Sequence, residues 1–149
     1  MAAIDVTGFN HTNFTVSDLD RAIAFFRDGL GFELLSRAPR SPELIGRMTG
    51  LPEPDIEVAF VEGPGHRIEL IQYRSPPPGR VVGRLCDAGS AHLALDVRDV
   101  GAAVEAAGRF GFALVGEVIA IDAGPNQGRE VCYLQDADGV TIEFIGPKP

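Results

Sequence analysis

Two histidines and two glutamates occupy matching places in the sequence, and these residue types together suit metal chemistry. His11 and His92 each open a stretch that resembles the other, and Glu69 and Glu143 each lie near the end of such a stretch. Imidazole nitrogens and carboxylate oxygens are ligands of divalent transition metals such as Zn, Ni, Co, Mn and Fe(II). We therefore predict that these four side chains bind one divalent metal ion and leave room there for a substrate.

An internal repeat supports this hypothesis. The segment HTNFTVSDLDRA from His11 is similar to HLALDVRDVGAA from His92, and a Gly-Phe pair follows each. Further on, RIELI around Glu69 matches TIEFI around Glu143. A single histidine in a strand is more often structural, and a single glutamate between apolar residues is usually solvated. Because two histidines and two glutamates recur at matching positions of the repeat, a shared metal site explains them better than four unrelated structural roles.

Each half of the repeat is predicted to form a βαβββ module. Apolar residues alternate in the expected strands, and a helix follows a capping residue, which is Ser17 or Asp18 in the first half and Asp99 in the second. Turn-forming residues, Gly63-Pro64-Gly65 and the DADG segment 136–139, separate the last two strands of each half. The expected strands are Phe9–Val16, Phe32–Ser36, Ile56–Glu62 and Arg67–Tyr73, then Ala91–Val97, Ala113–Ile119, Glu130–Gln135 and Thr141–Ile145, with the second helix over Val100–Arg109.

Strand alternation predicts which face of each module the candidate ligands share. Successive side chains of a strand point to opposite faces of its sheet. Apolar neighbours such as Ile68 and Leu70 suit the face that packs against a helix, so Glu69 is expected on the other face. The same reasoning separates His11, His92 and Glu143 from their apolar neighbours, and it predicts a polar surface away from the helices.

Length and composition favour a small-molecule partner. With 149 residues, of which 45% are hydrophobic, the chain has the size and core content of one domain. A formal net charge of −8 without a run of Lys or Arg offers no surface for nucleic acid or a membrane. No apolar stretch could cross a bilayer and no signal peptide is evident, so a cytoplasmic location is expected. Both cysteines, Cys86 and Cys132, are expected to be buried.

We predict that residues 1–149 form a single domain. The first module covers about residues 8–73, a linker covers 74–90, and the second module covers about 91–146. Three consecutive prolines, Pro76 to Pro78, favour a stiff linker. The proline-rich segment Arg37–Pro54 is long for a connection, and we expect a short helix around Glu43–Met48 that serves as a lid or pocket wall.

The repeated segments resemble the vicinal-oxygen-chelate superfamily. The stretches HTNFTVSDLDRAIAFF, RIELIQY, SAHLALDV and YLQDADGVTIEFI look like its characteristic segments and cover nearly the whole chain. The resemblance implies an α+β fold in which two tandem βαβββ modules form a cupped mixed sheet, the glyoxalase/bleomycin-resistance/dioxygenase fold. It also implies that the four candidate ligands occupy the family's metal-ligand positions, and that a homodimer forms, with the cup completed within one chain or between subunits.

For activity, the resemblance implies a lyase, isomerase or epimerase similar to glyoxalase I or methylmalonyl-CoA epimerase. A substrate with two neighbouring oxygens would chelate the metal, which stabilises an enediolate while Glu143 or Glu69 moves the proton; we favour Glu143 slightly. Arg67 and Arg129 are candidates for binding an anionic part of the substrate. Two alternatives stay open: an Fe(II)-dependent extradiol-type dioxygenase, against which a fourth ligand at Glu69 counts, and a drug-binding resistance protein, against which the intact ligand set counts.

Overall fold

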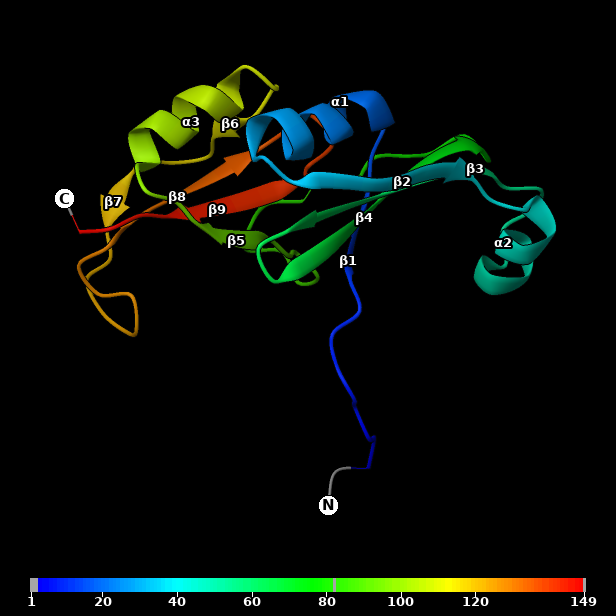
Figure 1. Ribbon diagram of the computed structural model, residues 1–149, viewed down its shortest axis with the longest axis horizontal. Coiled ribbons are helices and arrows are strands. Elements are labelled where there is room, and N and C mark those ends of the chain that lie inside the picture. Colours follow the sequence, from blue (N-terminus) through cyan, green and yellow to red (C-terminus); the bar gives the residue numbers. More distant parts are fainter. Residues whose placement is uncertain (1–2, 82, 149) are drawn as a thin grey trace. The chain divides into compact units, whose positions relative to one another are not determined.

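The computed structural model describes residues 3–81 and 83–148, so residue 82 of the predicted linker and the terminal residues 1, 2 and 149 lie outside the described residues. The chain divides into two compact units, Met1–Pro77 and Pro78–Pro149, and each contains one of the predicted modules (Figure 1). That the two modules act as a single domain stays a prediction. Among the described residues, no helix has the length and apolar character that a membrane span requires.

The first unit is built on a four-stranded mixed sheet with the order β1-β4-β3-β2. The strands β1 (Thr12–Thr15) and β4 (His66–Ser75) run parallel. The strands β2 (Glu33–Pro39) and β3 (Asp55–Gly63) join them through antiparallel pairs. The helix α1 (Leu19–Ala24) begins at Asp18, whose carboxylate accepts a hydrogen bond from the Arg21 backbone N–H at 2.9 Å, and it continues into the π-helical turn η1 (Phe25–Gly29).

The two faces of the first sheet are covered by different helices. Phe14 of β1 stacks on Phe26 of η1 with ring centroids 6.2 Å apart, so Phe14 and its strand partner Leu70 face α1 and η1. Ile71 therefore points to the opposite face. There the short helix α2 (Pro42–Thr49) places Ile45 in a cluster with Ile56 and Val58, and partly buried hydrophobic side chains pack against it: Phe60, Ile71 and Tyr73. The predicted short helix is confirmed, and it covers one end of the face that bears Glu69.

The second unit repeats this plan with an interrupted third strand. The strands β5 (Leu93–Asp96) and β9 (Thr141–Ile145) run parallel, and β8 (Glu130–Gln135) pairs antiparallel with β9. Two short strands, β6 (Ala113–Leu114) and β7 (Ile119–Ala120), both pair with β8. The helix α3 (Val100–Gly108) begins at the predicted cap Asp99, which accepts from the Ala102 N–H at 2.9 Å, and it contacts β6, β8 and β9.

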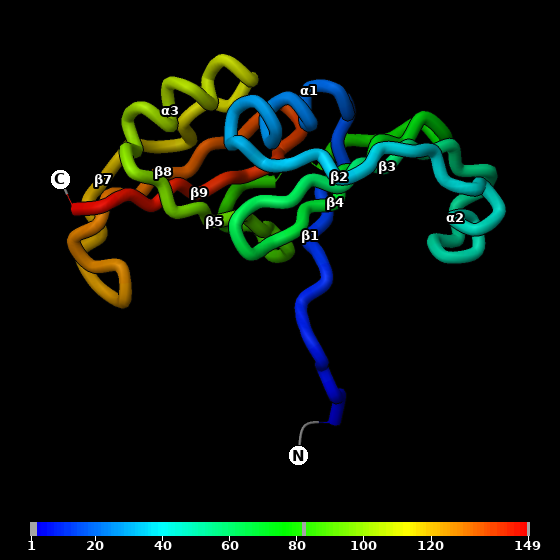
Figure 2. The backbone as a smooth tube through the Cα atoms, in the orientation of Figure 1, coloured from blue at the N-terminus to red at the C-terminus, as the bar shows by residue number. Residues whose placement is uncertain are grey.

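Each unit thus has the βαβββ order of the predicted α+β fold, but several strand predictions need correction. The strand predicted to end at Ser36 continues to Pro39, so the predicted connection Arg37–Pro54 begins within β2, and the strand predicted over Ala91–Val97 covers only Leu93–Asp96. The first strand begins at Thr12 and not at Phe9, whose side chain is 97% exposed on a segment that runs away from the sheet (Figure 2). Thr12 is aligned with Ile68, so β4, which begins at His66, offers Phe9 no pairing partner. The predicted strand Ala113–Ile119 is two short strands, because Gly116 adds no side chain to pack where the pairing is interrupted.

The prediction that both cysteines are buried is correct for Cys132 and wrong for Cys86. Cys132 lies within β8 and is 2% exposed. Cys86 is exposed. It lies in a polar turn, where the Asp87 carboxylate accepts a hydrogen bond from the Arg84 backbone N–H at 2.8 Å. Hydrogen bonds within the turn keep this segment at the surface, so Cys86 is exposed although cysteine is a residue type that is usually buried.

Candidate metal centre

The first unit brings His11 and Glu69 into contact. His11 directly precedes β1, and Glu69 lies in β4 opposite Asn13. The His11 Nε2 atom is 3.3 Å from Glu69 Oε2, and the Glu69 side chain is 19% exposed. Because Glu69 alternates with the fully buried residues Ile68 and Leu70, it points away from α1, as the strand pattern predicted.

Neighbouring side chains orient this first pair. His11 Nδ1 lies 2.6 Å from Asn10 Oδ1, and the Asn13 side-chain amide donates a hydrogen bond of 3.3 Å to Glu69 Oε2. The ring of Phe60, opposite Glu69 in the β3–β4 pair, meets His11 edge to face with centroids 5.6 Å apart. When Nδ1 carries the ring proton it donates to Asn10, and the lone pair of Nε2 faces the carboxylate. This is the tautomer in which Nε2 can bind a metal.

The second unit forms the matching pair. His92 Nε2 lies 3.1 Å from Glu143 Oε2, and the Glu143 side chain is 13% exposed. Within the sheet, Glu143 of β9 is aligned with Ala94 of the parallel strand β5 and with Tyr133 of the antiparallel strand β8. The Tyr133 ring meets His92 edge to face with centroids 5.1 Å apart. Burial, together with the negative charge of the neighbouring Glu143, raises the pKa of Tyr133.

The chemistry and spacing of each pair fit two ligands of one metal ion. Zinc bonds of about 2.0–2.2 Å, at angles from about 90° to about 109°, place two ligand atoms roughly 2.8–3.6 Å apart. The observed Nε2–Oε2 distances of 3.3 and 3.1 Å lie in this range. Across residues 3–81 and 83–148, however, no group of three or more His, Cys, Asp or Glu side chains is gathered. Each unit therefore supplies two candidate ligands, and the four-ligand set stays a prediction.

The two arginines predicted to bind substrate are both engaged in contacts. Arg67 Nη2 lies 3.1 Å from Glu62 Oε1, and this residue pair is two positions along the β3–β4 ladder from the pair of Phe60 and Glu69. Arg129 Nη2 donates to Asp96 Oδ1 at 2.6 Å, and its Nε donates to the Gly146 carbonyl at 3.0 Å. A substrate anion would have to share or replace these partners, and the anchoring role of both arginines stays a prediction.

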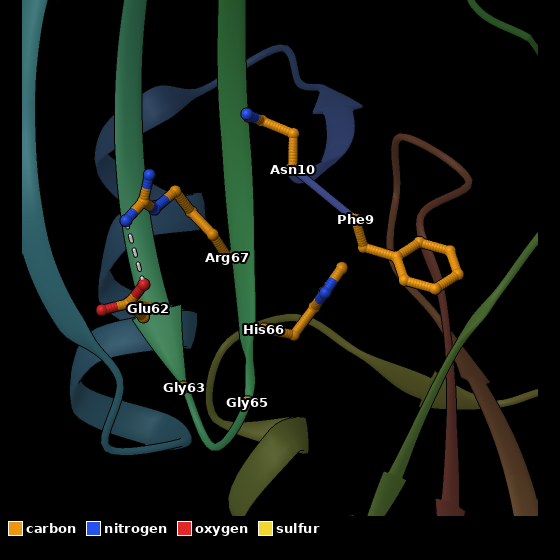
Figure 3. A pocket seen from close by; sticks show the side chains of 7 residues that line it. All are labelled: Phe9, Asn10, Glu62, Gly63, Gly65, His66 and Arg67. Atoms are coloured by element: carbon orange, nitrogen blue, oxygen red, sulfur yellow. Dashed lines mark hydrogen bonds and ion pairs between the residues drawn. The ribbon is translucent and has the colours of Figure 1, made fainter. Parts of the chain in front are cut away.

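A hollow of about 430 Å³ lies beside the turn that joins β3 to β4 (Figure 3). One of its residues, Asn10, also contacts His11. His66, which has no counterpart in the repeat, lies 2.8 Å through Nε2 from Thr12 Oγ1 and so joins the start of β4 to the start of β1. The residues that line the hollow are Phe9, Asn10, Glu62, Gly63, Gly65, His66 and Arg67.

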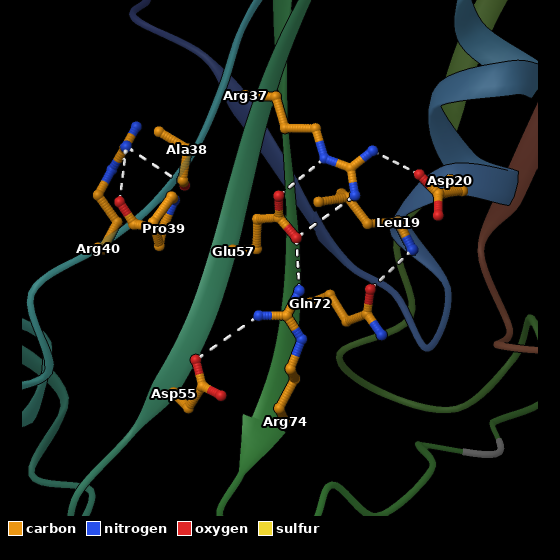
Figure 4. Close-up of polar contacts among 10 residues, drawn as sticks. All are labelled: Leu19, Asp20, Arg37, Ala38, Pro39, Arg40, Asp55, Glu57, Gln72 and Arg74. Carbon is orange, nitrogen blue, oxygen red and sulfur yellow. Dashed lines mark hydrogen bonds and ion pairs between the residues drawn. The ribbon is translucent and has the colours of Figure 1, made fainter.

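A separate polar cluster in the first unit has a structural role (Figure 4). The Arg37 guanidinium donates to Glu57 at 2.8 Å and to Asp20 of α1, and Arg74 donates to Glu57 at 2.5 Å. The hydrogen bond from Arg37, aided by that from Arg74, lowers the pKa of Glu57. Because Arg37 binds both a strand and the helix, this cluster holds α1 to the sheet that bears Glu69.

Sequence reasoning missed the side chains that lie beside the two glutamates in the sheets. Tyr133 was recoverable, because the expected strands end at Gln135 and begin at Thr141; pairing these two residues across the loop 136–140 places residue 133 opposite residue 143. Asn13 was not, because a parallel pair has no connecting turn from which its register follows.

The chain is similar to known proteins in both sequence and fold. The family model for the Glyoxalase/Bleomycin resistance protein/Dioxygenase superfamily matches residues 8–144. A 2-epi-5-epi-valiolone epimerase from Actinomyces sp. is 30% identical over 141 residues, covering 91% of this chain and 77% of the relative. A lactoylglutathione lyase from Haemophilus influenzae is 31% identical over 146 residues, covering 93% and 91%. The crystal structure of a glyoxalase family protein from Bacillus cereus has a TM-score of 0.84 at 29% identity, covering 100% and 99%.

Proposed function

Since this chain belongs to the glyoxalase/bleomycin resistance protein/dioxygenase superfamily, we propose that it is a metal-dependent enzyme of the glyoxalase I or epimerase type. The reaction would be a proton transfer beside a carbonyl group, either a shift to the adjacent carbon or an inversion at one carbon. The proposed substrates are small molecules with two neighbouring oxygens, such as a thiohemiacetal or an acyl thioester.

The observation that carries this proposal is the His–Glu pair found once in each unit. His11 with Glu69 and His92 with Glu143 have the same order in the repeat and similar Nε2–Oε2 distances of 3.3 and 3.1 Å. Two relatives with about 30% identity are described as an epimerase and a lyase, which are the two reaction classes proposed. We propose that both pairs bind one divalent metal ion, Ni, Zn, Co, Mn or Fe, within one chain or between the subunits of a homodimer.

The chain's own residues would divide the remaining work. A bound metal would supply Lewis-acid stabilisation of negative charge on the substrate oxygens. Glu143 is our first choice for the base that takes the proton and returns it, with Glu69 as the second. Their low exposure favours this role, because a carboxylate shielded from water interacts more strongly with a nearby proton donor. Arg67 and Arg129 would bind an anionic part of the substrate.

Metal analysis of protein purified without added metal tests this proposal. We expect about one divalent metal per four-ligand set in the wild type, loss of the metal in His92→Ala, and weaker binding in Glu69→Gln. His66→Ala is the matched control, because this histidine lies outside the proposed ligand set and should leave the metal content unchanged. Incorporation of solvent deuterium into a hemithioacetal or acyl-CoA substrate then measures proton transfer.

Two outcomes would contradict the proposal. A protein that holds no metal and cannot be loaded with one, yet binds a planar drug tightly, would be a binding protein of the same fold. Stoichiometric iron with oxygen consumption on a catechol would instead identify a dioxygenase.

A further inference from the structure

The residues between the proposed metal ligands and the hairpin turn differ between the two units. Glu62 and Arg67 are aligned in the β3–β4 ladder, on the face of Glu69 and two positions nearer the turn, and their side chains form an ion pair of 3.1 Å. The matching place of the β8–β9 ladder is occupied by Gln135 and Thr141. A charged pair in one unit thus stands where the other unit has a neutral pair.

The neutral pair is bonded internally, whereas the charged pair faces solvent. Gln135 Nε2 donates to Thr141 Oγ1 at 3.1 Å, and Thr141 is only 2% exposed. The Glu62 and Arg67 side chains are 45% and 43% exposed, and both residues line the hollow beside the β3–β4 turn (Figure 3). An exposed ion pair contributes little to stability, and the second unit shows that this step of the hairpin forms without charges. The charges of Glu62 and Arg67 are therefore better explained by a ligand than by the fold.

The charges at this place favour a neutral ligand over an anion. Glu33 of β2 is exposed and is aligned with Glu62 on the side away from Arg67, so two carboxylates accompany one guanidinium. An anion at Arg67 would be repelled by the carboxylates, and a cation at the same place would be repelled by the guanidinium. A hydroxyl group both donates and accepts hydrogen bonds, so it can bind either side chain without a charge of its own.

We propose that the hollow binds a neutral, hydroxylated part of the substrate, with Glu62 accepting a hydrogen bond from one hydroxyl group and Arg67 donating to another. Two residues of a strand span roughly 7 Å, so a molecule of a few carbons can reach from Glu69 to this pair. The inference rests on the proposed function and narrows it. The substrate class becomes hydroxy ketones or hydroxy aldehydes whose other groups are neutral hydroxyls, and Arg67 would bind a hydroxyl group in place of an anion.

Dihydroxyacetone and dihydroxyacetone phosphate test this proposal, because both are hydroxy ketones and only the second carries a charge. In solvent deuterium exchange with metal-loaded protein, we expect a higher kcat/KM for the neutral compound. Glu62→Gln keeps the size of the side chain and removes its charge, so kcat/KM for the phosphate should rise roughly tenfold and the preference should shrink. The control Glu105→Gln removes an exposed carboxylate on α3 of the second unit and should leave the preference unchanged.

Backbone amide signals give a measurement that depends on neither metal nor turnover. Gly63 and Gly65 line the hollow, so their amide signals in nitrogen-15 spectra of the metal-free protein report binding there. We expect dihydroxyacetone to shift both signals and the phosphate to shift them less. The amide of Gly108 on α3 is the control and should not move with either compound.

The two experiments separate this inference from the proposed function. Larger shifts or a higher kcat/KM with the phosphate, lost in Arg67→Gln, would show that Arg67 binds an anion and would overturn the inference. A preference for the neutral compound that Glu62→Gln leaves unchanged would also overturn it. Amide shifts with dihydroxyacetone in a protein that cannot be loaded with metal and turns over neither compound would refute the proposed function while supporting the hydroxyl site.

Discussion

The two units place the same His–Glu pair at the same strand positions but support it differently. In the first unit the Asn13 amide donates to Glu69, whereas in the second unit Ala94 takes the place of Asn13 and Tyr133 lies opposite Glu143 in the β8–β9 pair. The first unit also has a seven-residue β2 followed by α2, where the second has the two-residue strands β6 and β7. The comparison teaches that the repeated ligand positions depend on the parallel β1–β4 and β5–β9 pairs, and that the surrounding elements can differ without moving those positions.

The junction between helix and sheet differs in the same way. In the first unit the Gln72 side chain accepts from the Leu19 N–H at 3.0 Å and donates to the Ser17 carbonyl at 3.1 Å. The residue that follows β9 in the second unit is Gly146, which packs so closely against Val100 that a Cβ would lie 2.5 Å from Val100 Cγ2. One unit closes its junction with hydrogen bonds, and the other closes it with close packing.

Adding a side chain at the second junction should have the largest effect. In Gly146→Ala the new methyl group would overlap Val100 in the core, and overpacking of this kind typically costs about 1–3 kcal/mol. We expect a lower midpoint of unfolding in urea, measured by circular dichroism. Gly108→Ala is the matched control, because nothing lies within 4 Å of a Cβ at that position of α3, and it should not destabilise the protein. Equal midpoints for wild type and Gly146→Ala would show that the junction is not tightly packed.

Removing the polar side chain at the first junction should have a smaller effect. Gln72→Ala leaves the Leu19 N–H and the Ser17 carbonyl without this partner, and loss of a helix-capping contact typically costs about 1 kcal/mol. The same urea unfolding experiment measures it. Gln72→Glu can still accept from Leu19 but cannot donate to Ser17, so we expect an intermediate midpoint. A midpoint no lower in Gln72→Ala than in the wild type would refute the proposed role of the junction.

The smallest expected effect is a pH dependence confined to the first unit. Arg37 and Arg74 lower the pKa of Glu57, so the unfolded chain takes up a proton there at a higher pH than the folded protein does. The stabilisation is complete above the ordinary pKa of glutamate and is lost as the pH falls through the lower folded pKa. Between about pH 5 and about pH 3, the thermal midpoint of Glu57→Gln should therefore fall less steeply than that of the wild type.

A surface glutamate of the second unit provides the control for this pH experiment. Glu105 forms an exposed ion pair of 3.8 Å with Arg109 on α3. Since exposed pairs of this kind contribute little, Glu105→Gln should follow the wild-type curve. If Glu57→Gln also follows it, the Arg37–Glu57–Arg74 cluster does not contribute to the pH dependence.

The strands best predicted from sequence are those bounded by strong turn residues. Glu130–Gln135 and Thr141–Ile145 agree with the structure because the DADG turn defines both of their inner ends. Phe9 was wrongly included in a strand because alternation records the local pattern and not whether a partner strand reaches that far. Strand alternation also predicted the face on which Glu69 and Glu143 lie. It could not predict how near each histidine comes to its glutamate, because that distance depends on side-chain orientation and on the parallel register.

The contrast between the cysteines affects how the proposed homodimer should be measured. Cys86 is exposed, whereas Cys132 is buried in β8, and burial raises the pKa of its thiol. An oxidant will therefore react first with Cys86, and two chains joined by a disulfide at this residue would elute at the size of a dimer. Size measurements should be made in reductant or with Cys86→Ser, so that a covalent artefact of storage is not mistaken for native assembly.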